Sequence, residues 1–140
     1  MDTIKKINKW ANLHSYYPID ILRISLGVFL FTKGLYFMNN SLQLVELIQP
    51  FKNYVGEMIL IHYLVPAHII GGILIVFGLL TRWALIAQIP ILIGAVLINV
   101  IGEFQVSNFI IAGITLLIAI FFTYFGSGKH SADYHLKMQQ

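Results

Sequence analysis

The chain has 140 residues, of which 58% are hydrophobic and only 11% are charged. Soluble domains carry about 25% charged residues, so this composition excludes an ordinary water-soluble protein. The formal net charge is +3, and in so apolar a chain a basic excess points to membrane topology rather than to nucleic-acid binding. The sequence contains no cysteine, which excludes disulfide exchange, thiolate catalysis and iron–sulfur or zinc–thiolate sites.

Residues 1–17 carry an amphipathic pattern. Apolar side chains recur at every third position from Ile4 to Leu13, with lysines between them. This spacing predicts a basic helix that lies in the lipid headgroup layer. Tyr16 and Tyr17 then form an aromatic belt, and Pro18 opens the next segment, where its missing N–H is tolerated.

Four apolar runs are long enough to cross a membrane, because about 20 helical residues span a hydrocarbon core about 30 Å thick. They cover residues 19–38, 58–80, 83–101 and 109–125. The stretch "LLTRW" (Leu79–Trp83) and the linker Ile101–Asn108 allow only short turns, so consecutive spans are antiparallel. The sequence therefore predicts an all-α integral membrane protein. Residues 18–128 form an antiparallel up-down bundle of four transmembrane helices. The interfacial helix precedes this bundle, and a cytoplasmic tail at 129–140 follows it.

The basic residues outside the spans fall almost entirely on one side. With a cytoplasmic N-terminus, six lie inside the cell: Lys5, Lys6, Lys9, Arg82, Lys129 and Lys137. Lys52 alone lies outside, a distribution that the positive-inside rule favours. We therefore expect a multi-pass protein of the bacterial inner membrane with both termini in the cytoplasm. No cleaved signal peptide is expected, because the first apolar segment is already a full span.

The outer loop contains a further apolar segment, "SLQLVELIQPF" (Ser41–Phe51). It is too short to cross the membrane, and Pro50 ends it. It is either an interfacial helix or a plug over the outer end of the bundle.

Polar side chains within the spans are the candidate ligand-binding residues, because they are costly in lipid and turn toward the bundle interior. They are Lys33, His62, His68, Gln88 and Asn99, with Asn108 at the edge of the same outer layer. Each has a structural alternative: Lys33 as a snorkelling anchor, the histidines as neutral rings bonded to the next helix, and the amides as helix-packing groups. His62 and His68 lie about 120° apart around their helix, so they cannot bind one metal and no metal site is expected.

Small and rigid residues indicate how the helices cross. Gly27 and Gly34 are seven residues apart, as are Gly71 and Gly78, so each pair shares a helix face that suits close packing. The stripe from Asn108 through Thr115 to Thr123 in the fourth span has the same character. Pro66 and Pro90 lie inside the second and third spans, where kinks would widen a pocket between them.

Charged residues gather at the predicted cytoplasmic boundary. Arg23 and Asp20 lie near the start of the first span, Arg82 lies in the central turn, and Asp133 lies in the tail "GSGKHSADY". We expect structural ion pairs among Arg23, Arg82 and Asp133 that tie the tail to the bundle. Arg82 also holds its turn in the cytoplasm.

Three stretches carry further landmarks in a fixed order. They are "LRISLGVFLFTKGLYF" (Leu22–Phe37), "HIIGGILIVFGLLTRWALIAQIPILIGAVLIN" (His68–Asn99) and "FGSGKHSADYHL" (Phe125–Leu136). The landmarks are Arg23 with Gly27, the Gly71–Gly72 pair, the Gly78–Arg82 turn and the Gly126–Asp133 tail. From Pro18 to Leu136 the chain therefore resembles the DoxX family of small four-helix membrane proteins, most closely the branch common in Bacteroidetes-type bacteria.

The resemblance implies architecture more firmly than a reaction. DoxX-like proteins take their name from a small subunit associated with a thiosulfate:quinone oxidoreductase, and relatives are membrane partners in redox or oxidative-stress complexes. It thus implies an accessory inner-membrane subunit that contacts a quinone, or another lipophilic molecule, beside other membrane redox subunits. We expect Lys33, His68 and Asn99 to donate hydrogen bonds to the ligand's carbonyl oxygens, with His68 as a proton relay.

No catalytic motif accompanies these residues. The chain has no P-loop, no dinucleotide-binding glycine pattern and no metalloprotease helix motif, so no catalytic residue and no intrinsic cofactor are assigned. The alternative function is a non-catalytic scaffold or anchor that recruits partner proteins, or a second copy of itself, through its amphipathic ends and glycine-lined faces. A channel or transporter ranks last, because four spans with few charges make a poor polar conduit.

Overall fold

The computed structural model describes residues 2–14, 16–51, 56–102 and 105–136, and within them the regular structure is helical. The elements are α1 (Asp2–Leu13), α2 (Tyr17–Asn39), α3 (Ser41–Ile48), the 3₁₀ turn η1 (Gln49–Phe51), α4 (Glu57–Phe77), α5 (Thr81–Ile101), α6 (Val106–Phe125) and α7 (Ala132–His135). Lys52 and Lys137, which belong to the predicted charge distribution, lie outside the described residues.

Four helices, α2, α4, α5 and α6, are long and apolar enough to cross a membrane. Large apolar side chains cover their outer surfaces, such as Trp83 at 71% exposed and Leu117 at 68% exposed. Such surfaces are unfavourable in water but match the hydrocarbon interior of a bilayer. The predicted fold class is confirmed, and the chain is a multi-pass membrane protein in contact with lipid.

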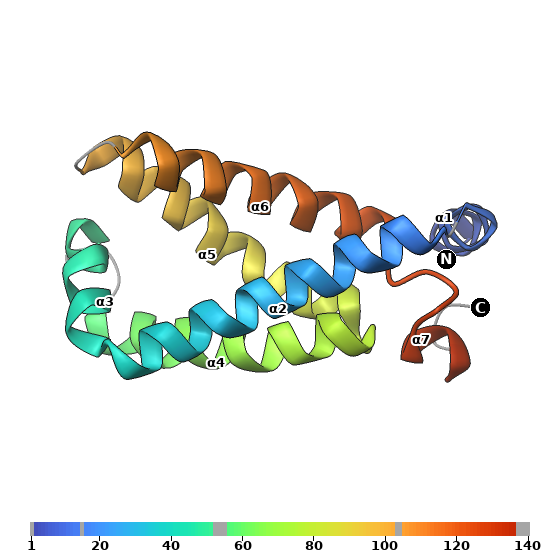
Figure 1. Ribbon diagram of the computed structural model, residues 1–140, viewed down its shortest axis with the longest axis horizontal. Helices are drawn as coiled ribbons and strands as arrows, with labels where there is room; N and C mark the ends of the chain where they lie inside the picture. The colour runs from blue at the N-terminus through green and yellow to red at the C-terminus, as the bar shows by residue number, and fades with distance from the viewer. Residues whose placement is uncertain (1, 15, 52–55, 103–104, 137–140) are drawn as a thin grey trace.

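The four long helices form two pairs (Figure 1). Helix α2 packs along α4, α6 packs along α5, and the short turn between α4 and α5 joins the pairs. The pairs diverge toward one end of the bundle, where α3 lies across the opening, and α1 and α7 lie at the opposite end (Figure 1). The buried core, which includes Leu30, Ile75 and Leu85, lies between these two ends.

Helices α2 and α4 cross at glycines. A Cβ atom on Gly72 would lie 2.7 Å from the backbone nitrogen of Phe31, and one on Gly27 would lie 2.7 Å from the backbone nitrogen of Val76. A Cβ atom on Gly34 would lie 2.9 Å from the backbone nitrogen of Ile69. Because only hydrogen fits between two backbones at this separation, these glycines allow a close crossing of α2 and α4, as the spacing of Gly27 and Gly34 predicts.

Gly78 has a different role from the helix crossing expected for it. It ends α4 with a φ of 67°, the left-handed conformation that favours glycine. The helix therefore stops at Phe77, before the end of the predicted span at Leu80. A Cβ atom on Gly78 would also overlap the Arg23 guanidinium, so the turn and the buried arginine fit together only with glycine here.

Helix α1 packs on the end of α6 with its polar side. Asn8 and Ala11 are buried, whereas Ile4, Trp10 and Leu13 are more than half exposed. The Trp10 ring meets the edge of Phe125 at a centroid distance of 6.0 Å. Ile4 and Leu13 of the apolar stripe thus remain uncovered by the rest of the chain, as an interfacial helix requires, while Trp10 also packs on Phe125.

Candidate functional site

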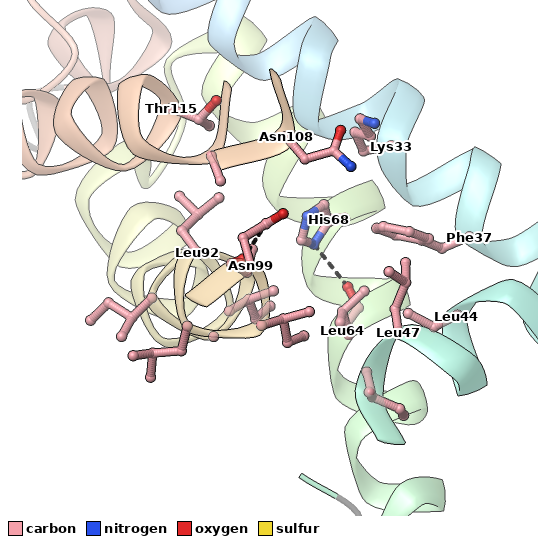
Figure 2. Close-up of a pocket in the computed structure, with 18 of the residues that line it drawn as sticks. Lys33, Phe37, Leu44, Leu47, Leu64, His68, Leu92, Asn99, Asn108 and Thr115 are labelled. Atoms are coloured by element: carbon pink, nitrogen blue, oxygen red, sulfur yellow. Dashed lines mark hydrogen bonds between the residues drawn. The ribbon is translucent and has the colours of Figure 1, made fainter. Parts of the chain in front are cut away.

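A cavity of about 1120 Å³ lies in the α3 half of the bundle. Helices α2, α4, α5 and α6 form its walls, and α3 covers one end (Figure 2). Its apolar lining includes Leu30, Leu44, Leu47, Leu64, Leu92 and Ile98. Ligand pockets commonly measure about 300–1,000 Å³, so this cavity can hold a lipophilic molecule of that class.

The divergence of the two helix pairs produces the cavity. Pro90 of α5 lines it, whereas Pro66 of α4 faces a separate, smaller pocket. Leu44 and Ile48 of α3 are buried and also line the large cavity, so α3 covers its end rather than lying free beside the bundle. This favours the plug over the interfacial helix for the outer segment.

Lys33, His68 and Asn99 come from three different helices and line this one cavity (Figure 2). His68 is only 4% exposed, and its Nδ1–H donates to the Leu64 carbonyl at 3.1 Å. Asn99 Nδ2 donates to the Ala95 carbonyl at 2.8 Å. Both side chains bond their own helix, so neither bridges to a neighbouring helix through these bonds.

The Lys33 ammonium lies over aromatic rings at the edge of the cavity. Its Nζ is 5.8 Å from the centroid of Phe29 and 5.9 Å from that of Tyr36. These distances suit cation–π contacts, which hold the charge beside the cavity while the side chain stays exposed. Lys33 can therefore donate to a ligand.

Further polar side chains that line the cavity include Asn108, which the sequence placed at the edge of the outer layer, Thr115, which it placed in a packing stripe, and Glu46, which it did not select. Thr115, expected in a packing stripe, is buried there and donates to the Ile111 carbonyl at 2.7 Å. Asn108 donates to Gln105 at 2.6 Å, and Glu46 lines the cavity from α3. The seven-residue spacing of Asn108 and Thr115 signals a polar face on an otherwise apolar helix, and only the fold shows that this face meets a cavity.

His62 and Gln88 lie outside the cavity lining. His62 is exposed, its Nδ1–H donates to the Met58 carbonyl at 2.8 Å, and it lines the smaller pocket of about 370 Å³ between α4 and α5. Gln88 is fully buried, and its Nε2 donates to the Ala67 carbonyl at 2.5 Å. Gln88 thus ties α5 to α4, next to the space that Gly71 leaves open.

At the other end of the bundle, Asp133 binds the start of α5. Its carboxylate accepts from the backbone N–H groups of Leu80 at 2.7 Å and Thr81 at 3.2 Å. Its own N–H donates to the Gly78 carbonyl at 2.9 Å. A carboxylate at a helix N-terminus satisfies free N–H groups and meets the positive end of the helix dipole. The tail therefore caps α5 from a distant part of the sequence.

Arg23 and Arg82 hold the tail and α6 mainly through carbonyls. Arg23 is 2% exposed and donates to the carbonyls of Ile75 and His130, each at 3.3 Å. Arg82 donates to the Tyr124 carbonyl at 3.1 Å. Both guanidinium groups lie close enough to Asp133 to interact with its charge.

Asp20 completes this cluster. It accepts a hydrogen bond from His130 Nδ1 at 2.7 Å and lies 3.9 Å from the Arg23 guanidinium. The His130 ring also stacks on Tyr17. The tail is thus anchored to the start of α2 as well as to the α4–α5 turn.

Comparison with known proteins agrees with this architecture. A family model described as DoxX matches residues 19–100, from the start of α2 to the end of α5. Among curated proteins and among solved structures, none matches the chain. No group of three metal-ligating side chains occurs in the part of the chain that the structure describes. Because the family match covers more than half of the 140 residues, including the motifs from Arg23 to the Gly78–Arg82 turn, the chain belongs to the DoxX family.

Proposed function

We propose that the protein is a DoxX-family subunit of the bacterial inner membrane that binds a quinone, or a similar lipophilic molecule with ring oxygens, in the α3-side cavity. The observation that carries this proposal is the convergence of Lys33, His68 and Asn99 on one large and mainly apolar cavity. Such a site buries the apolar ring and tail of a ligand and orients the ligand through a few polar groups.

The donor set fits a molecule that carries oxygens on a ring. Lys33 Nζ and the second N–H of Asn99 are free to donate to ligand oxygens, since only one Asn99 N–H is used within its helix. A bound quinone would supply two-electron, two-proton redox chemistry, and the chain's own side chains would bind and orient it. Electron transfer would then involve another redox subunit, which makes this chain an accessory protein.

The proposed orientation places α1 and α7 in the cytoplasm and α3 outside the inner membrane. Lys5, Lys6 and Lys9 lie on α1, and Arg82 lies at the start of α5, at the end of the bundle that also carries the tail (Figure 1). The positive-inside rule supports this arrangement. The cavity then opens in the outer half of the membrane.

The proposal is tested by measuring the affinity of the protein, in mild detergent, for a decyl-tailed benzoquinone. A Lys33→Ala/Asn99→Ala double variant should bind at least about tenfold more weakly, since two donated hydrogen bonds contribute on the order of 1.4 kcal/mol or more. Lys9→Ala/His62→Ala is the matched control, because both of its residues lie outside the cavity, and it should bind like the native protein. Absence of binding, or equal binding by both double variants, would overturn the proposal.

The scaffold alternative has one observation in its favour, the exposed apolar stripe of α1. The glycine faces support it less, because Gly27, Gly34 and Gly72 pack within the chain itself. A scaffold should purify with stoichiometric partners and keep them in the Lys33→Ala/Asn99→Ala variant. Partner binding that requires α1 and ignores the cavity would therefore favour this function over ligand binding.

A further inference from the structure

The hydrogen-bonding state of the His68 ring is fixed by its own helix. Nδ1 lies 3.1 Å from the Leu64 carbonyl oxygen, and a carbonyl can only accept. Nδ1 therefore carries the proton. In a neutral ring the other nitrogen, Nε2, then has a lone pair and can only accept.

The surroundings of His68 favour a neutral ring. The side chain is buried within the membrane-spanning part of α4, where an unpaired charge is costly. Lys33, a cation, lines the same cavity, and a second positive charge beside it would be repelled. Glu46 lines the cavity from α3 but is exposed, so solvent screens its charge.

Thr115, on α6, also offers a hydrogen-bond acceptor to the cavity. It is 6% exposed, and its hydroxyl proton is donated to the Ile111 carbonyl at 2.7 Å. The lone pairs of Oγ1 remain for a ligand. Asn99 likewise keeps its Oδ1 free, because its Nδ2 faces Ala95. The two buried polar side chains of the cavity, His68 and Thr115, thus offer acceptors rather than donors.

We propose that the cavity binds the reduced, hydroxyl-bearing form of its ligand, a quinol, more tightly than the quinone, an inference that rests on the proposed function. A quinol O–H can donate a hydrogen bond to His68 Nε2. A quinone carbonyl oxygen has no proton to donate, so its lone pairs would be repelled by the lone pair of Nε2. Moving the proton to Nε2 would break the bond to Leu64 and place two lone pairs 3.1 Å apart. Lys33 can donate to an oxygen of either form, so the preference is assigned to the acceptor at His68.

The test compares the two redox forms of one probe on the full-length chain in detergent. A decyl-tailed benzoquinone and its quinol are titrated separately by calorimetry under anaerobic conditions. Because the chain has no cysteine, the reductant that maintains the quinol leaves its covalent structure intact. The quinol should bind about tenfold more tightly, which corresponds to about 1.4 kcal/mol.

Two variants locate the preference. In His68→Gln the amide offers both a donor and an acceptor, so the tenfold ratio should fall to about one. His62→Gln is the matched control, because His62 bonds its own helix in the same way outside the cavity, and it should keep the ratio. In the native protein labelled with ¹⁵N-histidine, the quinol should shift the Nε2 signal of His68 and leave that of His62 in place, a readout that needs no substitution.

The outcomes separate the two proposals. Equal affinity for both forms, or tighter binding of the quinone, overturns the quinol preference and leaves the proposed function standing. Binding of neither form overturns both. Tighter quinol binding with an unmoved His68 signal also overturns the inference, because the preference would then arise elsewhere in the protein.

Discussion

Asn99 and Gln88 are amides on the same helix with different partners. Asn99 Nδ2 donates to Ala95 within α5, whereas Gln88 Nε2 donates across the interface to Ala67 on α4. Asn99 therefore contributes little to the packing of the bundle and lines the cavity instead. Gln88 contributes to packing and has no access to the cavity.

Asn99→Leu should leave stability nearly unchanged and weaken ligand binding. The Ala95 carbonyl keeps its backbone hydrogen bond within the helix, so the free energy of unfolding in detergent should change by less than about 0.5 kcal/mol. Loss of one hydrogen bond to the ligand should weaken quinone binding by about threefold to tenfold. Asn40→Leu is a control for binding, because Asn40, at the C-terminal end of α2, makes the same bond to the carbonyl four residues earlier but lies outside the cavity. A strongly destabilised Asn99→Leu protein would instead show a structural role.

Asp133→Ala should destabilise the tail and the start of α5. The substitution leaves the N–H groups of Leu80 and Thr81 without their carboxylate, at a cost of about 1–3 kcal/mol. Thermal unfolding in detergent and proteolysis of the tail measure the effect. His135→Ala, on the exposed side of α7, should leave both unchanged. Identical unfolding of the two variants would contradict the capping role of Asp133.

At the scale of the helices, the α2–α4 crossing depends on glycine. Gly72→Ala would push a methyl group to within 2.7 Å of the Phe31 backbone nitrogen, where neither helix can yield locally. We expect a loss of about 1–3 kcal/mol, as for overpacked cores, measured by unfolding in detergent.

Gly113→Ala provides the matched substitution, because no atom lies within 4 Å of the added methyl group. It should leave stability unchanged or raise it by up to about 1 kcal/mol through helix propensity. Equal destabilisation by both substitutions would mean that the α2–α4 backbones are not in close contact.

The helices and their crossing were predictable from sequence for a simple reason. The length of an apolar run and the spacing of Gly27 and Gly34 are properties of the sequence order itself. The capping of α5 was not predictable, because Asp133 bonds backbone N–H groups, which residue identities do not reveal. Sequence reasoning paired Asp133 with Arg23 and Arg82, whose charges do interact with it, but it did not predict that both arginines also donate to backbone carbonyls.

The candidate site was predictable only in part. Polarity within apolar spans selected Lys33, His68 and Asn99, which do line one cavity, but it also selected His62 and Gln88, which do not. Depth along a helix can be read from the sequence, whereas the rotation of each helix toward its neighbours depends on packing. The cavity itself arises from the divergence of two helix pairs, which no single span encodes.

At the scale of the whole molecule, the proposed orientation places α3 and α7 on opposite sides of the membrane. Because the chain lacks cysteine, single-cysteine variants report one position each. A membrane-impermeant maleimide should label Leu42→Cys, 80% exposed on α3, in intact cells. His135→Cys on α7 should react only after the membrane is permeabilised. The reverse labelling pattern would show that the protein has the opposite orientation in the membrane.

Photo-cross-linking in native membranes tests the central claim, that a ligand occupies the α3-side cavity. With an azidoquinone probe, adducts should concentrate on peptides that contain Lys33, His68 and Asn99, and excess unlabelled quinol should suppress them. Adducts spread over lipid-facing positions such as Trp83 and Leu117, unaffected by the competitor, would contradict the claim.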